Sequence, residues 1–163
     1  MGRLTLKDLF HPRGRINRVD FLVGGMLLAI FGVCLGFAIG TIMGMINALP
    51  APVVALIQIV LTAPLAYGQF CLGAKRLHDL NLPAVLALFS FVELIFTVYV
   101  AFTPPALLPA ALGQNITTID NSLMGIVVVF SLLLLFIPGT NGENRYGRRT
   151  VADARPQAHN LEG

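Results

Sequence analysis

The sequence predicts an all-α integral membrane protein, a four-helix bundle with both termini in the cytoplasm. Of its 163 residues, 56% are hydrophobic and 12% are charged, and the mean hydropathy is +0.79. Soluble domains carry about 25% charged residues, so this chain is poorly suited to water. Its length allows four membrane spans of about 20 residues each, joined by short connections.

Four apolar runs supply the predicted spans, which cover residues 21–46, 52–73, 84–103 and 119–137. Because the hydrocarbon offers no water to backbone groups, such runs must form helices or barrel strands. The runs are continuous rather than alternating, and this favours helices. We expect a cytoplasmic arm over residues 1–20, the bundle over 21–138 and a cytoplasmic tail over 139–163.

The basic residues predict the orientation. They precede the first run, follow the second and follow the fourth, whereas the loops 47–51 and 104–122 contain no Lys or Arg. This is the positive-inside pattern, which places the basic loops and both termini in the cytoplasm. It also accounts for the net charge of +3 without a nucleic-acid partner.

Two local signals mark helix starts. Asn17, followed three residues later by Asp20, resembles an N-cap that opens the first span. Asn81 before Pro83 is expected to open the third span in a similar way.

A glycine series is the strongest periodic feature of the first span. Its members recur every four residues and form a groove along one helix face: Gly32, Gly36, Gly40 and Gly44. Small residues allow helix backbones to approach closely in lipid. The groove is expected either to pack within one chain or to serve self-association or a pore.

Glu93 lies near the middle of the third span. An ionisable group at that depth costs about 2.5 kcal/mol or more, so Glu93 should be neutral, paired or directed into a cavity. Gln58 of the second span is a candidate partner at a comparable depth. Two roles remain open for Glu93, a satisfied buried group and the coupling of protons or cations.

Three polar motifs flank the spans: Gly14-Arg15-Ile16-Asn17-Arg18-Val19-Asp20-Phe21, Lys75-Arg76-Leu77-His78-Asp79 and Asn144-Arg145-Tyr146-Gly147. In their order and spacing they resemble the bacterial inner-membrane family catalogued as domain of unknown function 805, the YhaH-like membrane proteins. The resemblance implies a four-helix plasma-membrane protein with no established activity. The chain departs from the family pattern after Asp79, where Asn81-Leu82-Pro83-Ala84 replaces a Ser-Gly-Trp segment, and it contains no tryptophan.

All three motifs should lie at cytoplasmic helix ends, where they can meet. Charge-assisted hydrogen bonds near a low-dielectric boundary would be strong. We therefore expect a network that serves either as a structural lock or as a binding site for an anionic lipid, a nucleotide or a partner protein. Its predicted members are Arg15, Asn17, Arg18, Asp20, Arg76, His78, Asp79, Asn144, Arg145, Tyr146 and Gly147.

Catalysis finds little support in the sequence. His78-Asp79 has no cysteine or acid at zinc-like spacing, and no nucleophile stands beside a base. We expect no metal and no cofactor. The leading hypothesis is a non-enzymatic structural or interaction component in contact with the bilayer, anionic head groups, a membrane-protein partner or further copies of itself; the alternative is a small transporter or oligomeric channel that uses Glu93.

Overall fold

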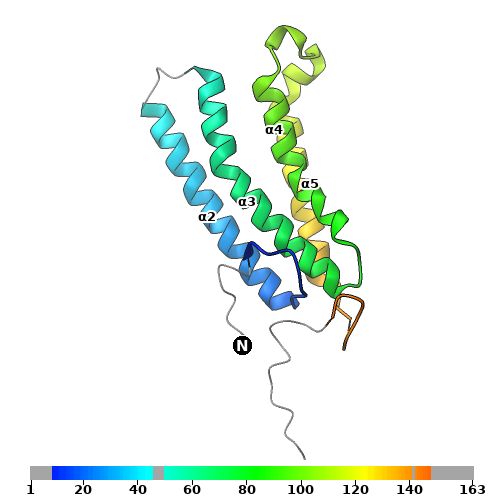
Figure 1. Cartoon of the computed structure of the whole chain (residues 1–163). Helices are drawn as coiled ribbons and strands as arrows, with labels where there is room; N and C mark the ends of the chain where they lie inside the picture. The colour runs from blue at the N-terminus through cyan, green and yellow to red at the C-terminus, as the bar shows by residue number, and fades with distance from the viewer. Residues whose placement is uncertain (1–8, 46–49, 141, 148–163) are drawn as a thin grey trace, which may run out of the picture.

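The computed structural model describes residues 9–45, 50–140 and 142–147, and this part of the chain is largely helical (Figure 1). Its elements are α2 (Arg18–Met45), α3 (Ala51–Asp79), the 3-10 helix η1 (Ala84–Phe91), α4 (Val92–Phe102), the 3-10 helix η2 (Pro105–Leu107) and α5 (Ala110–Phe136). With η1 and α4 taken as one span, four helices are long and apolar enough to cross a membrane. The predicted all-α multi-pass bundle is confirmed. The outer parts of the predicted arm and tail, residues 1–8 and 148–163, lie outside the described residues.

Two helices extend beyond their predicted bounds. Helix α3 continues past Gly73 to Asp79, and α5 begins at Ala110 rather than near residue 119. The prediction of a loop over residues 110–118 was therefore wrong. Hydropathy marks only the part of a helix that suits hydrocarbon, whereas the backbone hydrogen bonds of a helix continue into water.

The helix caps follow one prediction and contradict another. Asn17 opens α2 as expected, because its side-chain Oδ1 accepts a 2.7 Å hydrogen bond from the backbone N–H of Asp20. Asn81, however, ends α3 instead of opening η1. It has a positive φ of 62°, its N–H donates to the carbonyl of His78, and the next N–H, of Leu82, donates to Leu77 at 2.8 Å. This is a Schellman ending, in which asparagine tolerates the left-handed conformation.

Helix α3 is the centre of the bundle, since it contacts α2, η1, α4 and α5. Its last turns are the best-buried part, with Leu72, Ala74 and Leu77 all 0% exposed. The core around them is completed by Leu9, Ile16, Phe21, Leu28, Ala87 and Leu134. Toward the opposite end of the bundle, large apolar side chains such as Phe37 of α2 are exposed, as those of lipid-facing residues are.

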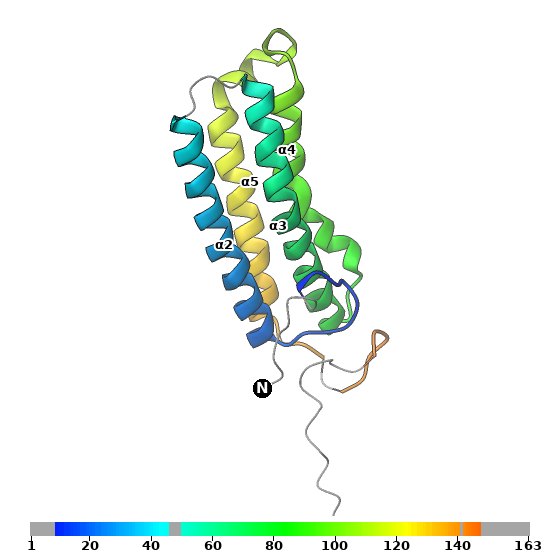
Figure 2. The ribbon, with the colours of Figure 1, turned by 60° about the vertical axis from the view of Figure 1, so that its left-hand side comes forward.

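The described lysine and arginine residues all lie at the end of the bundle where α2 begins and α3 and α5 finish, and we call it the basic end (Figures 1 and 2). They are Arg13, Arg15, Arg18, Lys75, Arg76 and Arg145. Arg15, Lys75 and Arg76 are buried there, so the basic end combines most of the core with most of the charge.

The glycines that permit close packing are not those of the periodic series. A Cβ added to Gly68 would lie 3.0 Å from Leu28, and one added to Gly24 would lie 3.0 Å from Leu72. Within the series, only Gly32 has a near neighbour, Leu65 at 3.6 Å, whereas Gly36, Gly40 and Gly44 have nothing within 4 Å. The chain therefore does not use these three glycines to pack its own described helices.

We predict that Gly68→Val destabilises the bundle by about 1–3 kcal/mol, because the new side chain must displace Leu28 in a packed contact. Gly36→Val is the matched control: it places the same β-branched residue in a helix, but in open space. Thermal unfolding in detergent micelles measures both. Equal midpoints for the two variants would contradict the packing described here.

Candidate functional site

The three polar motifs meet at the basic end (Figure 2). The contributing segments are the arm (residues 9–17), the last turn of α3 and the exit segment after α5 (residues 138–140 and 142–147). Asp79 is at the centre: its Oδ1 accepts a hydrogen bond from Arg15 Nη2 at 3.0 Å, and its Oδ2 accepts one from Arg76 Nη1. The three side chains are 0% exposed, so this is a buried triad of two guanidinium groups and one carboxylate.

Arg15 ties the arm to the exit segment. Its Nη1 donates to the carbonyls of Gly142 and Gly147 at 2.7 and 2.8 Å, and its Nη2 donates to the carbonyl and the hydroxyl of Thr140, both at 2.9 Å. Gly142 and Gly147 have φ values of 77° and 87°, which glycine adopts without a steric penalty. These turns direct the carbonyls toward the guanidinium group.

Arg76 ties α3 to the end of α5. Its Nε donates to the carbonyl of Leu134 at 2.8 Å, and its Nη2 donates to the carbonyl of Ile137. The Leu134 carbonyl would normally accept from the residue four positions later, but that residue is Pro138, which has no N–H. Arg76 thus supplies the missing donor, and its positive charge lies at the negative end of the helix dipole.

Thr140 and Asn144 satisfy the carbonyl groups at the end of α3. The N–H and the hydroxyl of Thr140 both donate to the Asp79 carbonyl at 2.8 Å. The side-chain amide of Asn144 donates to the His78 carbonyl at 2.8 Å and to the Thr140 hydroxyl at 3.0 Å. The last turn of α3 is therefore capped by the exit segment.

An aromatic layer covers the outer side of this cluster. The ring of His78 stacks on that of Tyr146 with 3.9 Å between centroids, and the guanidinium group of Arg145 lies 4.7 Å from the Tyr146 centroid. His78 Nδ1 lies 3.1 Å from the Gly14 carbonyl. A carbonyl can only accept, so Nδ1 carries the proton. Arg145 also donates to the Asn81 carbonyl at 2.8 Å, while its side chain stays exposed.

Some predicted members are not brought into the network. Arg18 is exposed and makes no hydrogen bond or ion pair with the described residues, and Asn17 is engaged in capping α2. The Asp20 carboxyl does not reach the triad, and its buried Oδ2 has no hydrogen-bond partner among the described residues. Conversely, Thr140 was not among the predicted members, although its place directly after Pro138-Gly139 at a helix end marks it as a capping candidate. The role of the network stays a prediction.

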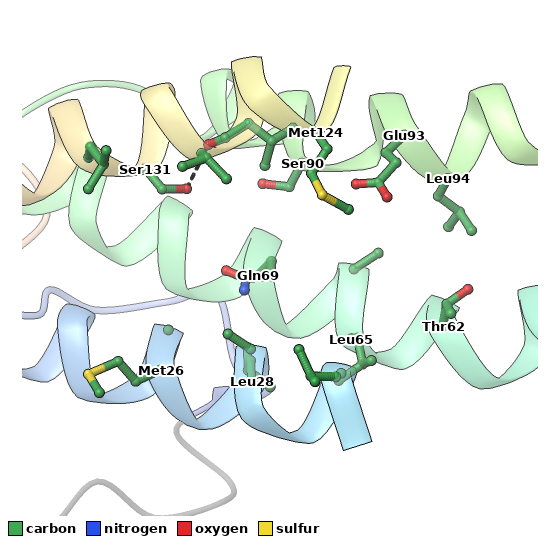
Figure 3. Close-up of a pocket in the computed structure, with 18 of the residues that line it drawn as sticks. Met26, Leu28, Thr62, Leu65, Gln69, Ser90, Glu93, Leu94, Met124 and Ser131 are labelled. Atoms are coloured by element: carbon green, nitrogen blue, oxygen red, sulfur yellow. Dashed lines mark hydrogen bonds between the residues drawn. The ribbon is translucent and has the colours of Figure 1, made fainter. Parts of the chain in front are cut away.

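A second polar region lies inside the bundle (Figure 3). A partly open cavity of about 750 Å³ lies between α2, α3, η1, α4 and α5. The polar side chains around it are Gln58, Thr62, Gln69, Ser90, Glu93, Thr97 and Ser131. Glu93 and Ser90 point into the cavity from one side, opposite Leu28 and Leu65.

Glu93 has no partner for its carboxyl group within the described part of the chain. The nearby Thr97 hydroxyl donates to the backbone carbonyl of Glu93 at 3.0 Å, and the side chain of Gln58 lines the same cavity without bonding to it. The predicted pairing of Glu93 with Gln58 is therefore absent, and the remaining expectation, a carboxyl directed into a cavity, describes its position. No group of three metal-ligating side chains occurs among the described residues.

We predict that Arg15→Gln lowers the free energy of unfolding by about 3 kcal/mol or more, because it removes one member of a buried ion cluster and leaves several carbonyls without donors. Arg13→Gln is the matched control, since Arg13 is exposed two residues away. Chemical denaturation in detergent compares the two. An unchanged stability of Arg15→Gln would contradict a structural role of the triad.

The chain was compared with curated proteins, solved structures and family models. No curated protein and no solved structure matches the chain significantly. A family model does match, over residues 9–148, a stretch that includes the three polar motifs and the four spans. The chain therefore belongs to the family described as "Protein of unknown function (DUF805)".

Proposed function

We propose that this multi-pass membrane protein is a non-enzymatic component of a bacterial inner membrane whose basic end faces the cytoplasm and contacts anionic lipid head groups. The orientation is supported by the distribution of charge. The described bases gather at one end of the bundle, and the connections at the other end contain none. Cytoplasmic loops carry this excess of bases in membrane proteins generally.

The observation that carries the proposal is the division of the arginines into two groups. Arg15 and Arg76 are 0% exposed and engaged with Asp79 and with backbone carbonyls. Arg13, Arg18 and Arg145 remain exposed at the same end. The buried group therefore acts as a lock, and the exposed group is what a ligand outside the bundle can reach.

The lock holds parts of the exposed group in place. Arg13 lies two residues before Arg15, and Arg145 is fixed by its bond to the Asn81 carbonyl and by the ring of Tyr146. Each base near an anionic surface contributes about 1 kcal/mol. Three of them would favour anionic over neutral head groups by roughly 100-fold, and added salt would weaken the preference.

We predict that replacing Arg13, Arg18 and Arg145 together with serine lowers the share of anionic lipid retained on purification from mixed phosphatidylglycerol and phosphatidylcholine bilayers. The matched control replaces the same three residues with lysine, which keeps the charge. Lipid analysis of the purified protein measures the share. A serine variant that retains as much phosphatidylglycerol as the wild type would exclude this role.

The cavity favours a second candidate function, a small transporter or channel. An ionisable group in a span marks an ion or substrate pathway in many membrane proteins, and the Glu93 carboxyl faces a cavity without a partner among the described residues. Association of copies through the open face of Gly36, Gly40 and Gly44 would suit an oligomeric channel and stays a prediction.

If the chain conducts, Glu93→Gln should abolish proton or small-ion flux in reconstituted liposomes, because the pathway loses its charged group. Glu143→Gln makes the same chemical change at an exposed position on the basic end and should leave the flux unchanged. A pH-sensitive dye inside the liposomes reports proton entry. Equal flux through both variants would argue against this candidate.

A further inference from the structure

We propose that the cavity beside Glu93 binds a lipophilic cation, a molecule with an apolar body and one positive charge, which reaches it from the bilayer between α2 and α5. This inference is independent of the lipid contacts at the basic end. It names the ligand class for the site on which the transporter alternative also rests, and it concerns binding, which is measured separately from flux.

The cavity has room for such a molecule. Its volume of about 750 Å³ falls in the range of about 300–1,000 Å³ that small-molecule sites occupy. Much of the space comes from α2, which presents the small residues Gly25, Ala29 and Gly32 to the cavity. Larger residues at these positions would fill it.

The residues that line the cavity explain why the proposed ligand carries a positive charge. Glu93 is directed into the cavity, and none of the described residues that line it is a lysine or an arginine. A cation would form an ion pair with the carboxylate and remove the cost of an isolated charge in a medium of low dielectric constant. An anion would be repelled.

The apolar residues of the lining explain why the rest of the proposed ligand is apolar. The apolar lining includes Leu65 of α3, Met124 and Leu132 of α5, and Met26 and Val33 of α2. Methionine side chains adapt to ligands of different shape. A bare Ca²⁺-like ion fits poorly, because such ions are usually held by several carboxylate and carbonyl oxygens, whereas Glu93 is the one acid among the described residues that line the cavity.

The route of entry follows from side-chain exposure. Met26 and Val33 on α2 line the cavity and are 53% and 72% exposed, and Val128 and Leu132 on α5 line it and are 51% and 46% exposed. The neighbouring helices therefore cover these side chains only in part. The cavity is therefore accessible along the α2 and α5 side, which lies in the membrane.

Tetraphenylphosphonium tests the proposal, with neutral tetraphenylmethane as the probe of similar shape. In equilibrium dialysis with the full chain in detergent, we expect saturable binding of the cation that the neutral compound does not displace. Glu93→Gln should weaken this binding by about tenfold or more, equivalent to about 1.4 kcal/mol. Glu143→Gln should bind as the wild type does. Equal affinity of wild type and Glu93→Gln would overturn the proposal.

A second pair of variants tests the location without changing the charge. Ala29→Phe should fill the cavity and abolish binding, whereas Ala38→Phe, at an exposed position of α2 outside the lining, should not. Size-exclusion chromatography establishes that each variant is folded, and Ala29→Phe decides the matter if Glu93→Gln does not fold. Undiminished binding by a folded Ala29→Phe protein would contradict the proposed site. If the wild type binds but carries no flux, the transporter alternative fails while this inference stands.

Discussion

The carboxylate of Asp79, shared between Arg15 and Arg76, is the interaction on which the basic end depends. It joins residues 15, 76 and 79, and through the two guanidinium groups it reaches backbone carbonyls at residues 134, 137, 140, 142 and 147. Burying three charges costs several kcal/mol for each ion unless the geometry satisfies them. Here the triad has two positive charges and one negative charge, and the carbonyl groups that accept from the two guanidinium groups stabilise the excess positive charge. The cluster is therefore stable only when all its segments are in place.

The same contacts provide hydrogen-bond donors for the unpaired backbone carbonyls at the ends of α3 and α5. The last carbonyls of α3 and α5 lack donors within their own helices, and Pro138 removes a further donor from α5. The side chains of Arg76, Thr140 and Asn144 supply the donors instead. A proline that ends one helix and an arginine on another thus form one structural unit, although 62 positions separate Arg76 from Pro138 in the sequence.

The sequence was most informative where one physical property dominates. Hydropathy located the four spans because solvent preference is additive along a run, and Asn17 was identified as a cap because its partner is local. The start of α5 at Ala110 was missed because helical hydrogen bonding continues where hydropathy falls. The glycine series was conspicuous in the sequence, yet close packing uses Gly24 and Gly68, since periodicity does not say which face meets a neighbour. Thr140 was missed for a related reason. Its bonds to the carbonyl of Asp79 and the guanidinium of Arg15 depend on tertiary structure, and the sequence does not indicate which backbone carbonyl a side chain will meet.

The sequence separation within the triad has a consequence for biosynthesis. The acceptors of Arg15 at Gly142 and Gly147 are 127 and 132 residues away, so they are translated only after all four spans. During insertion, the contact of Arg15 with Asp79 can form once α3 has been synthesised, whereas the contacts of Arg15 with Gly142 and Gly147 form only after the exit segment has left the ribosome. Closure of the basic end is thus a late step of folding, and in a nascent chain that ends before residue 142 the Arg15 Nη1 would lack both of its carbonyl acceptors.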